Sequence, residues 1–266
     1  MKPYYQDEWV TIYLGDCREI LPELPKVDLV LTSPPYDGLR EYGSCRFQFD
    51  ELPELLYDAV VWGGYCVWVV GDQVVGGSES GSSFRQALDF IDVGFNLHDT
   101  MIYQKNNSSL PDPTRYCQSF EYMFVFSKGK PQTFNPITDR ARKWLGRSSH
   151  TKKRKPNGEM IIVHRDPTKI SNKRGNIWLY DVGYNKGATD NIAFQHPATF
   201  PEKLALDHIL SWSNPSNLIL DPFLGSGTTA YCAKKLNRHC IGIELEEKYA
   251  EISAKRCSQM VMDLRI

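Results

Sequence analysis

Paired cysteines are absent from this sequence. Its seven cysteines are scattered and odd in number, and no two of them form a C-x-x-C pair. This pattern indicates neither a zinc ribbon nor a disulfide framework, and it favours a thiol-reduced, intracellular protein. The six histidines lack His-x-x-x-His spacing, so we expect them to be structural and expect no metal site.

Long apolar segments are absent as well. No apolar run approaches the roughly 18 residues of a membrane-spanning helix. The N-terminal stretch MKPYYQDEWV lacks the apolar core of a signal peptide. We therefore expect a cytoplasmic protein without a membrane partner. At 266 residues the chain can form one large α/β domain, or one domain with an insertion.

The chain has little net charge, −1 at pH 7, but this charge is unevenly distributed. Residues 128–174 carry fourteen Lys and Arg against three Asp and Glu, whereas the remainder has a net charge of −12. A basic segment in an otherwise acidic protein is typical of binding to a polyanion. A solvated loop without a partner is the alternative, and the charge count alone leaves both open.

Short apolar runs alternate with segments of helical periodicity along most of the chain. The predicted strands are residues 9–14, 27–32, 65–70, 97–104, 121–127, 218–220 and 239–244. The predicted helices include residues 53–62, 84–93, 201–212, 227–236 and 246–262. Alternating strands and helices predict a doubly wound, mostly parallel α/β sheet. The two strands before residue 128 leave little room for a helix between them, so we expect an antiparallel edge pair there.

The stretch LILDPFLGSGTTA, residues 218–230, has the form of a loop that binds a nucleoside cofactor. Gly225 and Gly227 stand between a strand and a helix, and Glu244 ends the next strand. Glycines allow the backbone to approach a ligand closely, and the Glu244 carboxylate can accept hydrogen bonds from ribose hydroxyls. NAD and S-adenosylmethionine both contain adenosine. Asp221 favours the second, because a carboxylate there can bind an ammonium group, which NAD lacks.

A second loop, Ser33-Pro34-Pro35-Tyr36, follows the apolar run at residues 27–32. Proline cannot donate a ladder hydrogen bond, so a central strand must end here. The loop brings together backbone carbonyls, one hydroxyl and one aromatic ring. A simple turn would also end a strand, so this stretch by itself does not separate a turn from a site.

Taken together and in this order, the two loops resemble the DNA amino-methyltransferases. More narrowly, they resemble the permuted beta class, in which the catalytic motif precedes the cofactor motif. The resemblance implies the α/β fold of class I S-adenosylmethionine-dependent methyltransferases, with a doubly wound, mostly parallel seven-stranded sheet. It divides the chain into a catalytic half (1–128), an inserted target-recognition segment (129–191) and a cofactor-binding half (192–266). It also places strand 218–220 beside strand 27–31, so that Asp221 and Ser33 would face one crevice.

The resemblance assigns roles to individual residues. The catalytic residues would be Ser33, Pro34, Pro35 and Tyr36. The cofactor would contact Asp16, Thr32, Phe200, Pro201, Asp221, Pro222, Phe223, Gly225, Ser226, Gly227, Thr228, Glu244 and Leu245. DNA would contact Arg40, Lys152, Lys153, Arg154, Lys155, Lys173 and Arg174. On pattern alone, Asp16 could instead cap the helix that follows it, and Phe200 could belong to the core.

The residue types also suggest a mechanism. The Ser33 hydroxyl and the Pro34 carbonyl can accept hydrogen bonds from the exocyclic amino group of a flipped-out base. These bonds would free the nitrogen lone pair for attack on the sulfonium methyl group, while Tyr36 stacks on the base. In the family, Ser at the first motif position goes mostly with cytosine, so we expect methylation of cytosine N4, with adenine N6 as the alternative.

Two other classes of function remain open at this point. An NAD-dependent oxidoreductase would use the glycine loop but leave SPPY unexplained, and a non-catalytic nucleic-acid-binding protein would use neither loop for chemistry. The expected cofactor is S-adenosylmethionine and the expected partner is double-stranded DNA. A cognate restriction endonuclease is a candidate second partner, and the sequence leaves monomer and dimer open.

Overall fold

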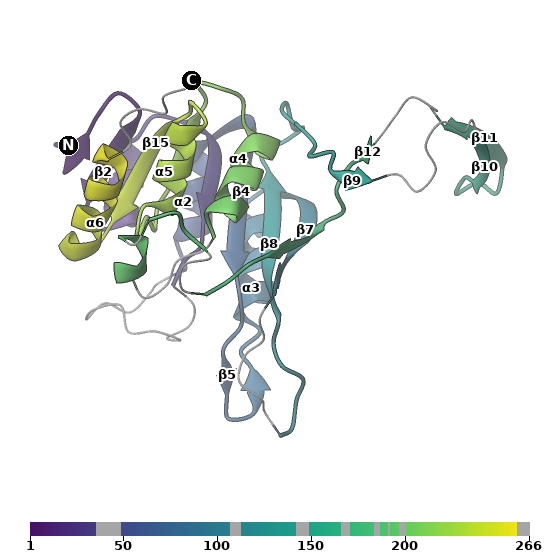
Figure 1. Ribbon diagram of the computed structural model, residues 1–266, viewed down its shortest axis with the longest axis horizontal. Coiled ribbons are helices and arrows are strands. Elements are labelled where there is room, and N and C mark those ends of the chain that lie inside the picture. Colours follow the sequence, from purple (N-terminus) through teal and green to yellow (C-terminus); the bar gives the residue numbers. More distant parts are fainter. Residues whose placement is uncertain are drawn as a thin grey trace. The chain divides into compact units, whose positions relative to one another are not determined.

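The computed structural model describes residues 1–35, 49–106, 113–141, 149–165, 171–183, 187–190, 192–196 and 201–259. The chain consists of two compact units. The larger unit comprises Met1–Asn135 and Asn176–Ile266, and the smaller unit comprises Pro136–Gly175. The larger unit is a sheet with helices packed against it (Figure 1).

Within the described residues of the larger unit, nine strands form one sheet in the order β1-β2-β15-β14-β3-β4-β8-β7-β13. Their bounds are β1 (Tyr5–Gln6), β2 (Val10–Leu14), β3 (Val27–Thr32), β4 (Val60–Val70), β7 (Asn96–Lys105), β8 (Phe120–Ser127), β13 (Ile177–Tyr180), β14 (Leu218–Asp221) and β15 (His239–Glu244). The central strands β2, β15, β14, β3 and β4 are parallel. The predicted doubly wound, mostly parallel sheet is confirmed, although nine strands replace the expected seven.

The two additional strands lie at the edges of the sheet. The short β1 pairs antiparallel with β2. At the other edge, β7 and β8 form the predicted antiparallel pair, but β13 pairs parallel with β7 on its outer side. The β7–β8 pair is therefore not an edge, which corrects the prediction. Residues 177–180 belong to the main sheet because Trp178 and Tyr180 turn inward and are buried.

Helices cover both faces of the sheet. The helices are α1 (Cys17–Ile20), α2 (Leu52–Ala59), α3 (Ser82–Asp92), α4 (Glu202–Trp212), α5 (Thr228–Lys235) and α6 (Glu247–Ser258). On β4, Tyr65 contacts Trp212 of α4, whereas Trp68 contacts Phe90 of α3. Strand residues three apart point to opposite faces, so α4 and α3 lie on opposite sides. Helices α4, α5 and α6 pack side by side (Figure 1).

Strands covered on both faces explain why the central runs are continuously apolar. In β3, Val27, Leu29, Val30 and Leu31 are all fully buried. The same holds for the middle of β4, where Trp68 donates from Nε1 to Gln86 Oε1 of α3 at 2.9 Å. A sheet packed between two layers of helices therefore supports the loops at the carboxyl ends of these strands.

Short strands also form where the sequence suggested loops. In the larger unit, β5 (Val74–Val75) and β6 (Ser78–Glu79) make a small hairpin after β4. In the smaller unit, β9 (Arg140–Ala141) pairs with β12 (Ser171–Asn172), and β10 (Ser149–Arg154) pairs antiparallel with β11 (Met160–Arg165). Across the described ranges, no helix is both long and apolar enough to cross a membrane.

Candidate functional site

The two loops singled out in the sequence meet at the carboxyl ends of adjacent parallel strands. Strand β14 pairs with β3 through Ile219 opposite Leu29 and Leu220 opposite Val30, which confirms the predicted neighbours. At the end of this pair, the Thr32 hydroxyl donates to Asp221 Oδ1 at 2.6 Å. Open α/β sheets bind their ligands at this kind of position, outside the carboxyl ends of the strands.

Asp221 is a buried carboxyl group at the floor of this junction. Burial raises its pKa to about 6, and hydrogen bonds from the Thr229 and Thr32 side chains and the Phe223 N–H partly offset that rise. The Phe223 N–H donates to Asp221 Oδ1 at 3.1 Å. A buried carboxylate is stabilised by a nearby cation. The site therefore suits a ligand that brings a positively charged group.

The glycine loop follows Asp221 and leads into α5. Gly225 and Gly227 have φ values of 53° and 78°, in the left-handed region that favours glycine. Side chains at these positions would also crowd their neighbours. A Cβ on Gly225 would lie 3.2 Å from His196 Nε2, and one on Gly227 would lie 3.0 Å from the Ser253 Cβ. Glycine therefore lets the loop pack closely against His196 and Ser253.

Glu244 ends β15 beside the glycine loop. Its Oε2 accepts from the Gly225 N–H at 2.7 Å and its Oε1 accepts from the Glu246 N–H at 3.0 Å. Burial raises the pKa of this carboxyl group, and these backbone donors partly counter the rise. Each oxygen keeps a second lone pair, so Glu244 can hold the loop and still accept from a ligand hydroxyl.

The remaining predicted residues fall at several places. Ser33 and Pro35 are partly buried and Pro34 is buried, directly after β3. Pro222, Ser226 and Thr228 are buried within or beside the glycine loop, Phe223 is half-buried, Pro201 precedes α4, and Leu245 is 45% exposed. Tyr36, Arg40 and Phe200 lie outside the described residues.

Asp16 caps the helix that follows it, which is one of its two expected roles. Its Oδ1 accepts from the Arg18 N–H at 2.9 Å, which caps α1. Its carboxylate also pairs with the Arg18 guanidinium, and this partner lowers the Asp16 pKa. Asp16 nevertheless lies at the same sheet edge as Glu244, because the Gly15 N–H donates to the Glu244 carbonyl at 2.9 Å.

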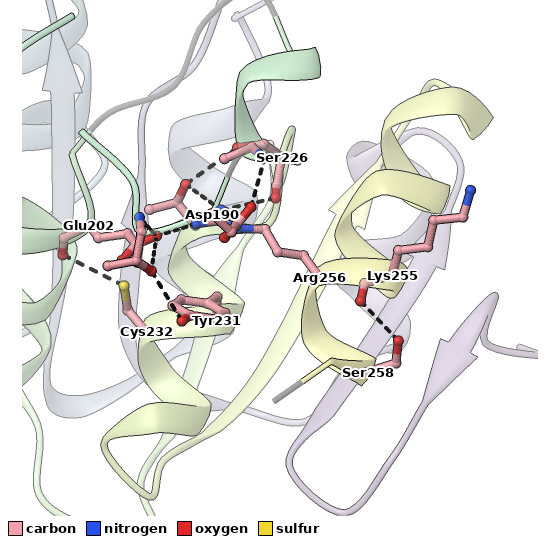
Figure 2. Close-up of polar contacts among 11 residues, drawn as sticks. Asp190, Glu202, Ser226, Tyr231, Cys232, Lys255, Arg256 and Ser258 are labelled. Atoms are coloured by element: carbon pink, nitrogen blue, oxygen red, sulfur yellow. Dashed lines mark hydrogen bonds and ion pairs between the residues drawn. The ribbon is translucent and has the colours of Figure 1, made fainter. Parts of the chain in front are cut away.

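Three residues near the loop were not predicted as site residues. The buried His196 ring packs against Tyr249, with ring centroids 4.2 Å apart, and borders Gly225. From α6, Ser253 Oγ donates to the Gly225 carbonyl at 2.6 Å, and Arg256 reaches the loop one turn later (Figure 2). The spacing of the histidines did not single out His196, and the polar sequence of α6 did not distinguish Ser253 and Arg256 from exposed residues.

No group of three or more His, Cys, Asp and Glu side chains that could hold a metal ion occurs among the described residues. Of the cysteines in those ranges, Cys17, Cys66, Cys232, Cys240 and Cys257 are buried thiols and Cys117 is exposed.

Comparison with known proteins agrees with this geometry. Residues 27–255 match the family model of the N6/N4 DNA methylases. The orphan methyltransferase M.BamHII of Bacillus amyloliquefaciens is 50% identical over 252 residues, which cover 94% of this chain and 92% of that protein. The chain therefore belongs to the N6/N4 DNA methylase family. It is a DNA methyltransferase, and its cofactor is S-adenosylmethionine, as predicted.

Solved structures support the fold. The PvuII DNA methyltransferase, described as cytosine-N4-specific, superposes with a TM-score of 0.71 at 22% identity, covering 100% of this chain and 90% of that one. A complex of M1.HpyAVI with S-adenosylmethionine superposes with a TM-score of 0.63 at 23% identity, covering 93% and 99%. Membership of this family sets aside the NAD-dependent oxidoreductase.

Proposed function

We propose that this methyltransferase acts on the exocyclic N4 amino group of cytosine in double-stranded DNA. We further propose that the two loops at the ends of β3 and β14 form its active site. The observation that carries this proposal is the Thr32–Asp221 hydrogen bond, which joins the end of one loop to the start of the other. The predicted catalytic and cofactor motifs thus start from the carboxyl ends of adjacent strands, although they lie about 190 residues apart in the chain.

The described residues fit the proposed cofactor. The left-handed glycines shape the loop beside Glu244, and Glu244 can accept from ribose hydroxyls. Asp221 can bind the ammonium of the methionine part, which would offset the cost of its burial. The other proposed cofactor contacts are Pro222, Phe223, Gly225, Ser226, Gly227 and Thr228 of the glycine loop, together with Asp16, Thr32, Phe200, Pro201 and Leu245.

Ser33 and Pro34 act on the base in this proposal. The cofactor supplies an electrophilic methyl group, and the amino nitrogen that receives it releases one proton. The nitrogen is a weak nucleophile while its lone pair is conjugated with the ring. Hydrogen bonds from its two N–H groups to the Ser33 hydroxyl and the Pro34 carbonyl favour a pyramidal nitrogen with a freed lone pair. Tyr36 stacks on the flipped base and Pro35 shapes the turn.

The preference for cytosine rests on Ser33, which stands where the family mostly has Ser for cytosine and an acid or amide for adenine. The PvuII enzyme, whose fold this chain shares, carries a cytosine-N4 description and supports the same choice. Adenine N6 is the alternative, since both bases present an amino group beside a ring nitrogen.

The hairpin of the smaller unit is the proposed DNA contact. Four successive basic residues, 152–155, lie at the end of β10 and directly after it, and neighbours on a strand point to opposite faces. We call Lys152 and Arg154 the first basic pair and Lys153 and Lys155 the second basic pair. All four side chains are exposed; within the strand, Lys152 and Arg154 lie on the face opposite to Lys153, and Lys155 follows the strand. The major groove admits a two-stranded ribbon between two walls of phosphates, which suits basic residues on both faces.

Two of the basic residues of the smaller unit already have acidic partners. Arg174 donates from Nε to Asp139 Oδ2 at 2.8 Å, and Lys155 pairs with Glu159 at 2.7 Å. Both pairs are on the surface, where ion pairs are weak, so DNA phosphates can compete for these cations. The proposed DNA contacts also include Lys173, Arg174 and Arg40.

The test of this function is the identity of the methylated nucleoside. Unmethylated DNA is incubated with the protein and S-adenosylmethionine, digested to nucleosides and separated by mass spectrometry. The proposal predicts N4-methylcytidine. N6-methyladenosine without methylcytidine would overturn the choice of base, and unmodified DNA from folded, cofactor-binding protein would overturn the proposed activity on double-stranded DNA.

A further inference from the structure

A buried arginine on the last helix lies behind the glycine loop. Arg256 is 1% exposed, and its guanidinium donates to four partners (Figure 2). Nε donates to Asp190 Oδ2 at 2.6 Å, and Nη2 donates to Glu202 Oε1 at 2.5 Å. Nη1 donates to the Ser226 carbonyl at 3.2 Å and to Thr228 Oγ1 at 3.0 Å. One side chain thus joins α6 to three other segments.

Only an arginine can make this set of contacts. The planar guanidinium presents its donors in a fixed fork, whereas a lysine has a single ammonium on a flexible stem. The Tyr231 ring lies 4.8 Å from the guanidinium carbon and closes the site from α5. Burying a charge is costly, and a buried ion pair adds little net stability compared with apolar packing. This arrangement therefore calls for an explanation other than stability.

The glycine loop is held from behind by α6. Ser253 Oγ donates to the Gly225 carbonyl, and Arg256 donates to the carbonyl of the next residue, Ser226. From the other side, Glu244 accepts from the Gly225 N–H. Glycines in the left-handed region give a loop many accessible conformations, and these three contacts select one of them.

The same arginine fixes the segment before α4. Asp190 accepts from Arg256 through Oδ2 and from the Ala193 N–H through Oδ1, at 2.9 Å, which starts the short 3-10 helix Ala193–Gln195. Glu202 accepts from the Thr189 N–H at 2.9 Å. This segment ends at His196, whose ring borders Gly225. Both walls beside the glycine loop therefore depend on one guanidinium.

We propose that Arg256 is a positioning residue for cofactor binding, which sets the glycine loop, residues 189 and 190 and residues 192–196 in the conformation that receives S-adenosylmethionine. The proposal rests on the proposed placement of the cofactor at that loop. Preorganisation of this kind lowers the ordering cost of binding and acts on affinity more than on the later chemical step. The family match ends at residue 255, so it assigns Arg256 no role.

The test compares two arginine-to-lysine variants. Arg256→Lys keeps the positive charge between Asp190 and Glu202 but loses the fork that reaches the loop. Arg238→Lys is the matched control, because Arg238 is also buried, at 5% exposure, and donates to the Ser213 and Leu236 carbonyls away from the loop. Cofactor affinity is measured by calorimetry, thermal stability by melting, and the kinetic parameters with DNA substrate.

We expect Arg256→Lys to raise the dissociation constant for S-adenosylmethionine about tenfold. With saturating cofactor, kcat and the KM for DNA should stay close to wild type. Arg238→Lys should lower the melting temperature without changing cofactor affinity. Unchanged affinity in folded Arg256→Lys, or equal losses of affinity in both variants, would overturn the proposal.

A second pair of variants covers the case in which Arg256→Lys does not fold. Ser253→Ala removes one loop contact without leaving a charge unpaired, and we expect a smaller loss of affinity in the same direction. A folded Ser253→Ala with wild-type affinity contradicts the role of α6 in holding the loop. If Glu244→Gln also keeps wild-type affinity, the cofactor lies elsewhere, and the placement on which the inference rests is what fails.

Discussion

Cofactor binding should weaken as the pH falls from 7 to 5, because Asp221 gains a proton in that range. Burial raises the pKa of Asp221 to about 6 in the free protein. Only the ionised form attracts the ammonium of S-adenosylmethionine. An α-amino group keeps its proton below about pH 7.7, so the ligand charge is constant across this window.

The size of the effect follows from the raised pKa. A carboxyl group with a pKa near 6 is about 90% ionised at pH 7 and about 10% ionised at pH 5. The bound ammonium lowers this pKa well below 5, so the dissociation constant should rise about tenfold between pH 7 and pH 5. For an unperturbed aspartate, with a pKa near 3.9, the same change would be less than about 1.2-fold.

The sign for folding is opposite. Because the folded-state pKa of Asp221 lies above its unfolded value, the protonated form is favoured in the folded protein. The contribution of this group to stability is therefore present at low pH and is lost as the pH rises from about 4 to about 6. Bound cofactor should reverse this loss, so the thermal shift caused by the cofactor should grow with pH.

The assay is calorimetric titration with S-adenosylmethionine at several pH values from 5 to 7. The control is Asp221→Asn, which keeps the shape of the side chain but cannot ionise. Glu244 also has a raised pKa and lies near Asp221, so only the difference between wild type and the variant reports on Asp221. A wild-type affinity that is flat over this range, or one that falls equally in Asp221→Asn, would refute the assignment.

Three further predictions concern other parts of the site. Glu244→Gln should weaken S-adenosylmethionine binding by about 1.5–3 kcal/mol, because the amide nitrogen of Gln cannot accept a hydrogen bond as the second carboxylate oxygen does; calorimetry on folded protein checks this. Ser33→Ala should slow single-turnover methyl transfer roughly tenfold with nearly unchanged cofactor affinity, and wild-type turnover would remove Ser33 from catalysis. Neutralising the first or the second basic pair should flatten the dependence of DNA affinity on salt by similar amounts. An effect confined to one pair would indicate that only one face of the hairpin contacts DNA. If neither change has an effect, the hairpin is a solvated surface element that does not bind DNA.

The sequence allowed the sheet to be predicted because its central strands are covered on both faces. Strands β3 and β15 have the predicted bounds, Val27–Thr32 and His239–Glu244. Local pattern was less informative at boundaries. The helix expected at residues 53–62 ends at Ala59, because the β-branched residues Val60 and Val61 begin β4.

The strands of the smaller unit escaped prediction for a different reason. In β10, basic residues occupy both faces of the strand, so no apolar alternation marks it. Strand β13, IWLY, was missed because an apolar run of four residues is too short to identify a strand; Trp178 and Tyr180 are buried, whereas Ile177 and Leu179 are exposed. Pairing with another strand, rather than local periodicity, defines these elements.

The positions of the two motifs were predictable because each stands directly after a strand. The contacts that hold these motifs in place were not predictable. Arg256 reads as a solvated charge on a polar helix, and its partners Asp190 and Glu202 lie 66 and 54 residues away in the chain. Only the folded chain shows that this charge is buried against the glycine loop.

A crystal structure of the protein with S-adenosylmethionine tests most directly whether the two loops form one methyl-transfer site. We expect the ammonium within hydrogen-bond distance of Asp221, the ribose hydroxyls on Glu244, and the sulfonium methyl directed toward Ser33 and Pro34. A cofactor bound away from the glycine loop, or bound there with its methyl group turned away from Ser33, would contradict the account.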